Sequence, residues 1–271
     1  FLEGQIHWTR VFMSVSLLHM LFAVAFHWQR IKAGWNHWMQ SPTSPWDLAV
    51  FRILFLSAVV WDMQGWAFTY GLKWTSFPRS QMVPLPYLGW LQDILPISPK
   101  LYTAAALAAT VLLLLAILGM FTRAALLLYL PLGFYIWAVP CFYGKLNHNQ
   151  IMLWFPLLLA LGRSSDVLSL DSLWKRWRRP EWRPPTRAVE YGTPIRFVLL
   201  LLAVIYFWAG VYKFWDSGFD WALSNSMISQ FQLEWAEHYD RMPWIRIDHW
   251  PWLCKLGGVA VIYFEMLFIF L

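Results

Sequence analysis

Apolar residues along this chain occur in long runs that are separated by shorter polar or aromatic links. Seven runs are close to the length that crosses a bilayer as a helix: roughly 11–28, 47–66, 101–120, 123–140, 149–162, 195–213 and 256–271. Ser44-Pro45 precedes the second run and Ser98-Pro99 precedes the third, a pattern typical of helix N-termini. The sequence therefore predicts an all-α fold, a polytopic transmembrane bundle of about six to seven spans.

The composition excludes most other classes of protein. Hydrophobic residues make up 59% of the 271 positions, and charged residues make up only 13%. A soluble domain of this size would expose apolar patches large enough to aggregate. An ordinary soluble enzyme, a disordered chain and a disulfide scaffold are therefore not expected, and an integral membrane protein is.

Basic residues are concentrated in one link, between the fifth and sixth runs. Seven of the 21 Lys and Arg residues lie there: Arg163 at its start, and a cluster of six made of Lys175, Arg176, Arg178, Arg179, Arg183 and Arg187. Such a loop is more typical of a topology signal or of contact with anionic lipid headgroups than of nucleic-acid binding. We expect membrane lipids as partners, no nucleic acid, and a cytoplasmic location for the loop 163–196.

Tryptophan is unusually frequent, with 21 residues, and much of it lies in the links rather than in the runs. If the basic loop is cytoplasmic, the Trp-containing links 67–100 and 214–255 lie on the opposite side of the membrane. Indole rings suit the membrane–water interface, so we expect short interfacial helices there. We also expect two domains: an N-terminal helix with an interfacial segment at 1–46, and a transmembrane core at 47–271.

Two polar clusters break the apolar pattern. Tyr143 to Gln150 includes Asn147 and His148 and opens the fifth run, and Lys213 ends the sixth. Each is either an ordinary interfacial cluster or part of a cavity, because polar groups at membrane depth need partners. No metal-ligand motif accompanies them, so no metal is expected.

Topology places the two clusters on the same, non-cytoplasmic side of the membrane. The fifth helix begins there and the sixth ends there, so His148 and Lys213 are expected at the same depth. Desolvation disfavours a charged lysine, which favours Lys213 as a base, and His148 would donate to a developing anion. The candidate catalytic residues are thus Lys213 and His148. The candidate cofactor-binding residues beside them are Tyr143, Asn147, Tyr212 and Trp215.

Arg52 is a second charge inside an apolar run, early in the second predicted helix. We expect a structural role, in which it either extends to the interface or pairs with Asp47.

Three segments resemble one family in order along the chain. These are Asp47-Leu-Ala-Val-Phe-Arg52, then Asn147-His148 with the later Ser-Leu-Asp171-Ser, then Tyr206-Phe-Trp-Ala-Gly-Val-Tyr-Lys213 with Asp220-Trp221 and Ser226-Met227. They resemble the horizontally transferred transmembrane domain (HTTM) proteins, which are bacterial relatives of the vitamin K-dependent gamma-carboxylase.

The resemblance implies an integral protein of a bacterial inner membrane that binds a quinone or hydroquinone. In the carboxylase a lysine deprotonates the hydroquinone and a histidine supports carboxylation. Lys213 and His148 match those residues, on the lumenal or periplasmic side. The sequence departs from the family at Tyr212, where the family has a paired lysine. The carboxylase's large luminal domain is not represented, and we expect the core to continue beyond Leu271.

Two classes of function stay open at this point. The first is a membrane enzyme with a quinone-like cofactor at Lys213 and His148. The second is a non-catalytic accessory or structural subunit of a larger respiratory or photosynthetic membrane complex, whose Trp-rich surfaces pack against other subunits. A cavity at Lys213 favours the first, and a lysine sealed by an aromatic ring or a helix favours the second.

The sidedness of the basic loop is directly testable. A cysteine introduced into the loop 163–194 is expected to react with a membrane-impermeant thiol reagent from the cytoplasmic side, because positively charged loops are retained there. Labelling of intact cells and of inverted vesicles measures this. Reaction from the outer side would invert the whole topology.

Overall fold

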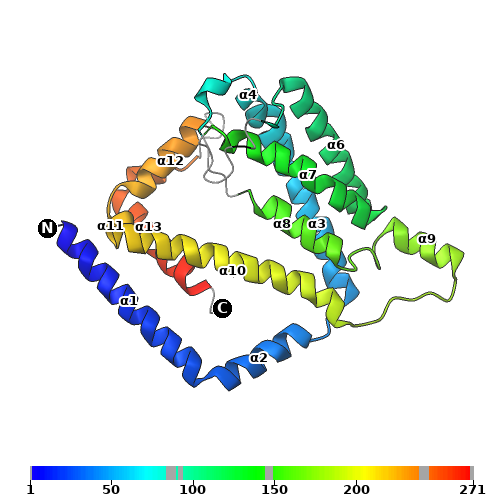
Figure 1. The fold of residues 1–271 in the computed structure, drawn as a ribbon, viewed down its shortest axis with the longest axis horizontal. Helices are drawn as coiled ribbons and strands as arrows, with labels where there is room; N and C mark the ends of the chain where they lie inside the picture. Colours follow the sequence, from blue (N-terminus) through cyan, green and yellow to red (C-terminus); the bar gives the residue numbers. More distant parts are fainter. Residues whose placement is uncertain (1, 84–89, 91–93, 144–148, 238–243, 269–271) are drawn as a thin grey trace. The chain divides into compact units, whose positions relative to one another are not determined.

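The computed structural model describes residues 2–83, 90, 94–143, 149–237 and 244–268 (Figure 1). The described residues form helices and no strand, apart from one isolated bridge between Thr43 and Ala188. The all-α prediction is therefore confirmed.

The helices follow the apolar runs. They are α1 (Leu2–Phe26), α2 (Trp28–Gln40), α3 (Pro45–Gly65), α4 (Leu72–Trp74), α6 (Pro99–Leu118), α7 (Thr122–Cys141), α8 (Ile151–Leu161), α9 (Leu170–Arg178), α10 (Val189–Ser217), α11 (Asp220–Leu223), α12 (Ser226–Glu237) and α13 (Pro251–Leu267). A π-helical turn, Trp66–Gly71, joins α3 to α4, and single 3₁₀ turns lie at Arg79–Gln81 and Ile247–His249.

In the part of the chain that the structure describes, four helices are long and apolar enough to cross a membrane: Pro45–Trp74, Pro99–Leu118, Thr122–Cys141 and Val189–Ser217. Two shorter apolar helices, Met13–Phe26 and Ile151–Leu161, correspond to two further predicted runs. The chain is thus compatible with an integral membrane protein, while the expected six to seven spans remain a prediction.

Helix starts follow the predicted signals more closely than helix ends do. Ser44 and Ser98 are N-caps whose hydroxyls accept hydrogen bonds from the backbone N–H of Trp46 and Leu101. The predicted end of the second run at residue 66 was wrong, because the helix continues as the π-helical turn and α4 to Trp74. Aromatic residues fill this stretch and keep it helical, with the Trp66 and Tyr70 rings 4.6 Å apart.

The chain forms two compact units. Unit 1 contains residues 1–35 and 199–271, and unit 2 contains residues 36–198. The predicted boundary at residue 46 divides an N-terminal segment from the predicted transmembrane core. The two compact units do not test this boundary, so it remains a prediction.

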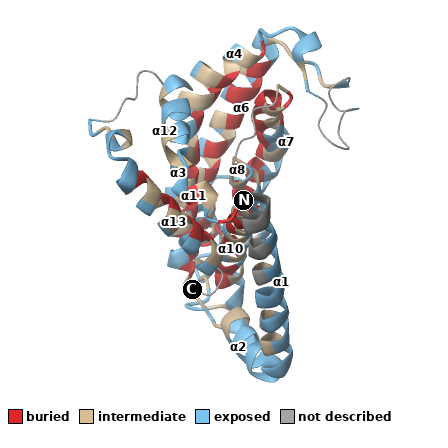
Figure 2. Cartoon of the chain, turned by 90° about the vertical axis from the view of Figure 1, so that its left-hand side faces the viewer, coloured by how far each residue is buried: buried red, intermediate tan, exposed pale blue. Residues whose placement is uncertain are grey.

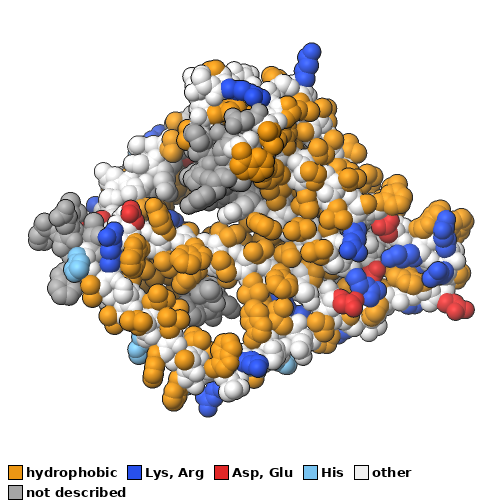
Figure 3. Space-filling model, viewed as in Figure 1, with side chains coloured by type: hydrophobic (Ala, Val, Ile, Leu, Met, Phe, Trp, Pro, Cys, Tyr) orange, Lys and Arg blue, Asp and Glu red, His pale blue; other side chains and the backbone are white. Residues whose placement is uncertain are grey.

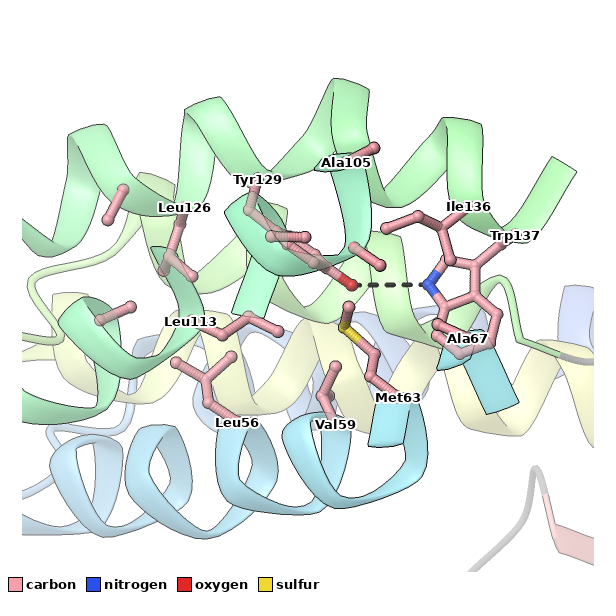
Figure 4. Packing of buried hydrophobic residues seen from close by; sticks show 14 of the residues in the cluster. Leu56, Val59, Met63, Ala67, Ala105, Leu113, Leu126, Tyr129, Ile136 and Trp137 are labelled. Carbon is pink, nitrogen blue, oxygen red and sulfur yellow. Dashed lines mark hydrogen bonds between the residues drawn. The ribbon is translucent and has the colours of Figure 1, made fainter. Parts of the chain in front are cut away.

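The core of unit 2 lies between α3, α6, α7 and α8. Leu56, Val59 and Met63 repeat at helical spacing on α3 and are fully buried, facing α6 and α7 (Figure 4). Four alanines of α6 are also buried, and small residues let helix backbones approach closely. Buried residues concentrate on these inner faces, whereas the described side chains of α1 and α2 are mostly exposed (Figure 2).

Unit 1 contains a smaller cluster around α13, which packs against α11 and α12. Phe214, Ala222 and Ile262 are buried in it, and Met13, Trp221, Val259 and Met266 pack against them. The short helices α11 and α12 lie in the link 214–255, where short helices were predicted.

Arg52 holds the loop after α8 to the core of unit 2. It is 0% exposed, and its guanidinium donates to the backbone carbonyls of Ser164 and Leu168. The expectation that it extends to the interface or pairs with Asp47 was wrong, because the loop wraps around the guanidinium and supplies carbonyl oxygens. The expected structural role is retained through different partners.

Asp171 fixes the same region from the other side. Its carboxylate accepts hydrogen bonds from the N–H of Phe121 and Thr122, at 3.0 and 3.3 Å, where α7 begins. Its own N–H donates to the carbonyl of Gly119 at 3.0 Å. Gly119 has φ +72°, and a Cβ there would lie 2.1 Å from Cβ of Ser169. Only glycine fits this close junction.

Replacing Arg52 is expected to destabilise the protein strongly. Arg52→Met keeps most of the apolar stem but removes the guanidinium, so two buried carbonyls lose their donors, at a cost of about 2–4 kcal/mol. Denaturant unfolding in detergent measures the change. Arg123→Met is the matched control, because Arg123 is exposed at the start of α7. Equal effects of the two variants would contradict the role of Arg52.

Candidate functional site

Lys213 on α10 forms an ion pair with Glu265 on α13. The Nζ atom lies 2.7 Å from Oε1 and 2.8 Å from Oε2 of the carboxylate, so both oxygens accept from one ammonium group. The side chains are 23% and 10% exposed, respectively. The pair therefore retains a narrow access to its surroundings from the lysine side.

A glycine allows the two helices to approach at this point. A Cβ added at Gly210, one turn before Lys213, would lie 2.9 Å from the Cβ of Glu265 and 3.0 Å from the backbone N of Met266. Any larger residue would separate α10 from α13. The Ala209-Gly210 step of the sequence motif thus places the lysine against the carboxylate.

An aromatic ring covers the ammonium group. The Nζ atom of Lys213 lies 4.5 Å from the ring centroid of Trp221, within the range of a cation–π interaction. Trp221 belongs to α11, which follows a turn at Gly218 with φ +58°. Lys213 is thus held between a carboxylate and the face of an indole, beside the apolar cluster of unit 1.

This arrangement keeps an ammonium group and a carboxylate in direct contact between two helices. In apolar surroundings two separate charges are costly, whereas a pair in direct contact is tolerated. The predicted role of Lys213 as a base therefore depends on Glu265 as well as on desolvation, and it remains a prediction.

Glu265 was not predicted from the sequence. It lies inside the run 256–271, which was treated as an ordinary membrane span. The sequence did contain a sign of its role, because Glu265 is a lone carboxylate in an apolar helix. An ionisable residue at such a position needs a partner. A search for two lone opposite charges on the last two apolar runs would have found the pair.

The residues beside Lys213 have different surroundings. Tyr212 is mostly exposed. Trp215 is partly exposed, its carbonyl accepts from Nε of Arg10 at 3.3 Å, and its ring lies 5.8 Å from the Arg10 guanidinium. The ring against the ammonium is that of Trp221. Roles of Tyr212 and Trp215 in cofactor binding remain predictions.

The second predicted cluster belongs to unit 2. Tyr143 donates its hydroxyl to the carbonyl of Phe77 at 3.0 Å, and its ring lies 5.9 Å from that of Trp74. Burial raises the pKa of Tyr143 above the ordinary value, so the phenol stays a neutral donor. Asn147 and His148 lie outside the described residues. The meeting of His148 with Lys213 therefore remains a prediction.

Unit 2 contains a further charged network, centred on Asp166. This buried carboxylate accepts from the hydroxyl of Tyr191 at 2.9 Å and from Nε of Arg163 at 2.8 Å, and Nζ of Lys175 lies 3.4 Å away. Arg163 also pairs with Glu190, and this hydrogen bond raises the pKa of Arg163. The network connects the loop after α8 with α9 and α10 and is structural.

No group of three metal-ligating side chains occurs in the part of the chain that the structure describes. Comparison with protein-family models, with curated proteins and with solved structures finds no match. The resemblance to HTTM proteins therefore remains a proposal, and the chemistry of the site follows from its own geometry.

The coupling between Lys213 and Glu265 can be measured by a double-mutant cycle. Lys213→Met alone leaves a desolvated carboxylate without its cation, at an expected cost of about 2–4 kcal/mol, less than for a fully sealed pair. The double variant Lys213→Met/Glu265→Gln removes both charges at similar volume and is expected to recover most of this loss. Thermal unfolding in detergent provides the comparison, and strictly additive effects would show that the two side chains do not interact.

Proposed function

We propose that this chain is an integral membrane protein with a carboxylase-like core, and that it binds a quinone-type ligand beside the Lys213–Glu265 pair. The observation that carries the proposal is one ammonium group in contact with a carboxylate and an indole face, between apolar helices. Ionisable groups on apolar helices are costly and mark functional sites by default. The order of motifs that resemble HTTM proteins adds support.

The side chains around Lys213 suit an aromatic ligand with an acidic hydroxyl. Trp221 offers an aromatic ring beside the ammonium group, and the Lys213 side chain is 23% exposed. A hydroquinone, when bound, supplies a phenolic proton. In the proposed step the Nζ atom passes one proton to Glu265 across 2.7 Å and then accepts the phenolic proton, so the site ends with one additional proton and the bound ligand carries the negative charge.

The competing function is that of a non-catalytic subunit of a larger membrane complex. Two observations favour it: the charge of Lys213 is already matched by Glu265 of α13, and the ring of Trp221 lies against the ammonium group. A lysine covered by an aromatic ring and a helix is the arrangement expected for this second function, in which the pair connects α10 and α13. Exposed tryptophans on apolar helices, such as Trp61 and Trp208, would then contact neighbouring subunits.

Ligand binding distinguishes the two functions. A short-chain naphthohydroquinone is titrated against the purified protein in nanodiscs, with calorimetry as the readout. The variant Lys213→Met/Glu265→Gln is expected to weaken binding by about 10–100-fold, the value of one or two hydrogen bonds to a charged group. Because the proton passes from the ligand to the site, the absorption of the bound hydroquinone anion reports this step, and it is expected to disappear in the double variant.

Lys255→Met is the matched control, because Lys255 lies on the same helix as Glu265 and outside the ion pair. Binding to the control is expected to equal that of the parent protein. If the double variant binds as tightly as the parent, the proposed site is wrong. If the parent binds no hydroquinone and purifies only with other subunits, the second function is favoured.

A further inference from the structure

Helix α9, in the basic link between α8 and α10, packs on unit 2 through its polar side. Ser169 is its N-cap and accepts from the N–H of Ser172 at 3.0 Å, and the hydroxyl of Ser172 donates to the carbonyl of Ser169. Asp171 is bonded to the start of α7 through Phe121 and Thr122. The buried residue of this helix is a serine, Ser172.

The opposite side of α9 is apolar and exposed. Leu170, Leu173, Trp174 and Trp177 lie at positions i, i+3, i+4 and i+7, which share one face of a helix. Leu173 is 60% exposed and Trp177 is 74% exposed. A surface helix of a soluble protein shows the reverse, with its apolar face against the core. The polar contacts of Ser169 and Asp171 fix the rotation of α9, so the apolar face is directed outward.

Basic side chains flank this apolar face. Arg176, Arg178 and Arg179 lie on α9 or directly after it, and Arg183 and Arg187 follow in the same link, whereas Lys175 is paired with Asp166. Over residues 170–188 the acids are Asp171, already bonded to α7, and Glu181. Figure 3 shows Lys and Arg side chains gathered around α9 at the edge of the molecule.

The aromatic and basic side chains of α9 are in contact with one another. The guanidinium of Arg178 lies 4.6 Å from the ring centroid of Trp174, and the rings of Trp174 and Trp177 are 5.2 Å apart. The charged end of Arg178 thus lies over the indole of Trp174 as a cation–π contact, at the border of the apolar face. Trp, Leu and basic residues arranged in this way are typical of helices in the interfacial plane of a membrane.

We propose that α9 lies in the surface layer of an anionic bilayer leaflet. Leu170, Leu173, Trp174 and Trp177 would enter the boundary between headgroups and acyl chains, and the basic residues would bind lipid phosphates. Charge complementarity selects an anionic lipid surface over an apolar protein partner, because the cationic residues surround the apolar face. The inference requires a membrane protein but not the proposed quinone site.

The depth of two neighbouring positions tests the proposal. Nitroxide labels are placed at Trp177→Cys on the apolar face and, as the matched control, at Arg176→Cys, with both native cysteines replaced by alanine. The protein is reconstituted at one chain per nanodisc with phosphatidylglycerol. The label at 177 is expected to collide several-fold more with oxygen than with a water-soluble nickel chelate, and the label at 176 to show the opposite preference.

Two outcomes would overturn the proposal. A label at 177 that remains open to the nickel chelate means that no lipid covers the face. A label that becomes shielded only when two chains share one disc means that a second copy covers it. Trp177 has no role in the polar contacts of α9, so the variant is expected to fold, and an unchanged melting temperature verifies this.

The charge requirement is tested separately by counting bound lipid. Each basic residue near an anionic surface contributes about a five-fold increase in affinity, so replacing Arg176, Arg178 and Arg179 with glutamine is expected to weaken phosphatidylglycerol retention on the order of 100-fold. Native mass spectrometry measures retained lipid against phosphatidylcholine. The control replaces exposed Lys73, Arg79 and Lys100 instead, and an equal loss in both variants would exclude a specific role for α9.

Discussion

The structure depends on how charges are compensated where water is scarce. An ionised group surrounded by apolar helices is tolerated only when a fixed partner replaces its hydration. Arg52 receives backbone carbonyls, Asp171 receives backbone N–H groups, and Lys213 receives the carboxylate of Glu265. Each of these contacts joins segments that are distant in sequence. The few charges in the apolar runs therefore fix the positions of loops and helices that hydrophobic packing alone leaves free to slide.

The type of partner separates a structural charge from a reactive one. Arg52 contacts carbonyl oxygens that do not titrate, and a guanidinium does not release its proton in a protein. Lys213 contacts another charged side chain, with Nζ 2.7 and 2.8 Å from the two carboxylate oxygens of Glu265, and the proposed proton transfer depends on this contact. Trp221 adds an uncharged surface that stabilises the cation and favours flat ligands. This difference is why unit 1, rather than the larger charged network around Asp166, contains the candidate site.

Sequence patterns predicted the helices well because apolar periodicity and length report directly on membrane-compatible segments. Ser44 and Ser98 were identifiable as caps since the chemistry of a helix start is local. Lys213 was identifiable as an isolated charge. Its partner was not, because periodicity does not say which two helices come into contact. The partners of Arg52 are backbone carbonyls, which have no sequence signature at all, and the position of His148 relative to Lys213 depends on residues outside those described.

The π-helical turn Trp66–Gly71 restricts which insertions and deletions this protein can accept in evolution. Such a turn is equivalent to an α-helix with one residue inserted, and it rotates everything that follows by about 100° relative to the preceding helix. In this setting the ring of Trp74 contacts that of Tyr143, which comes from the segment after α7. Loss of a single residue from the turn would restore a regular helix and carry Trp74 to another side. The number of residues between Arg52 and Trp74 is therefore constrained. A relative that keeps the contacts of both side chains must keep that number.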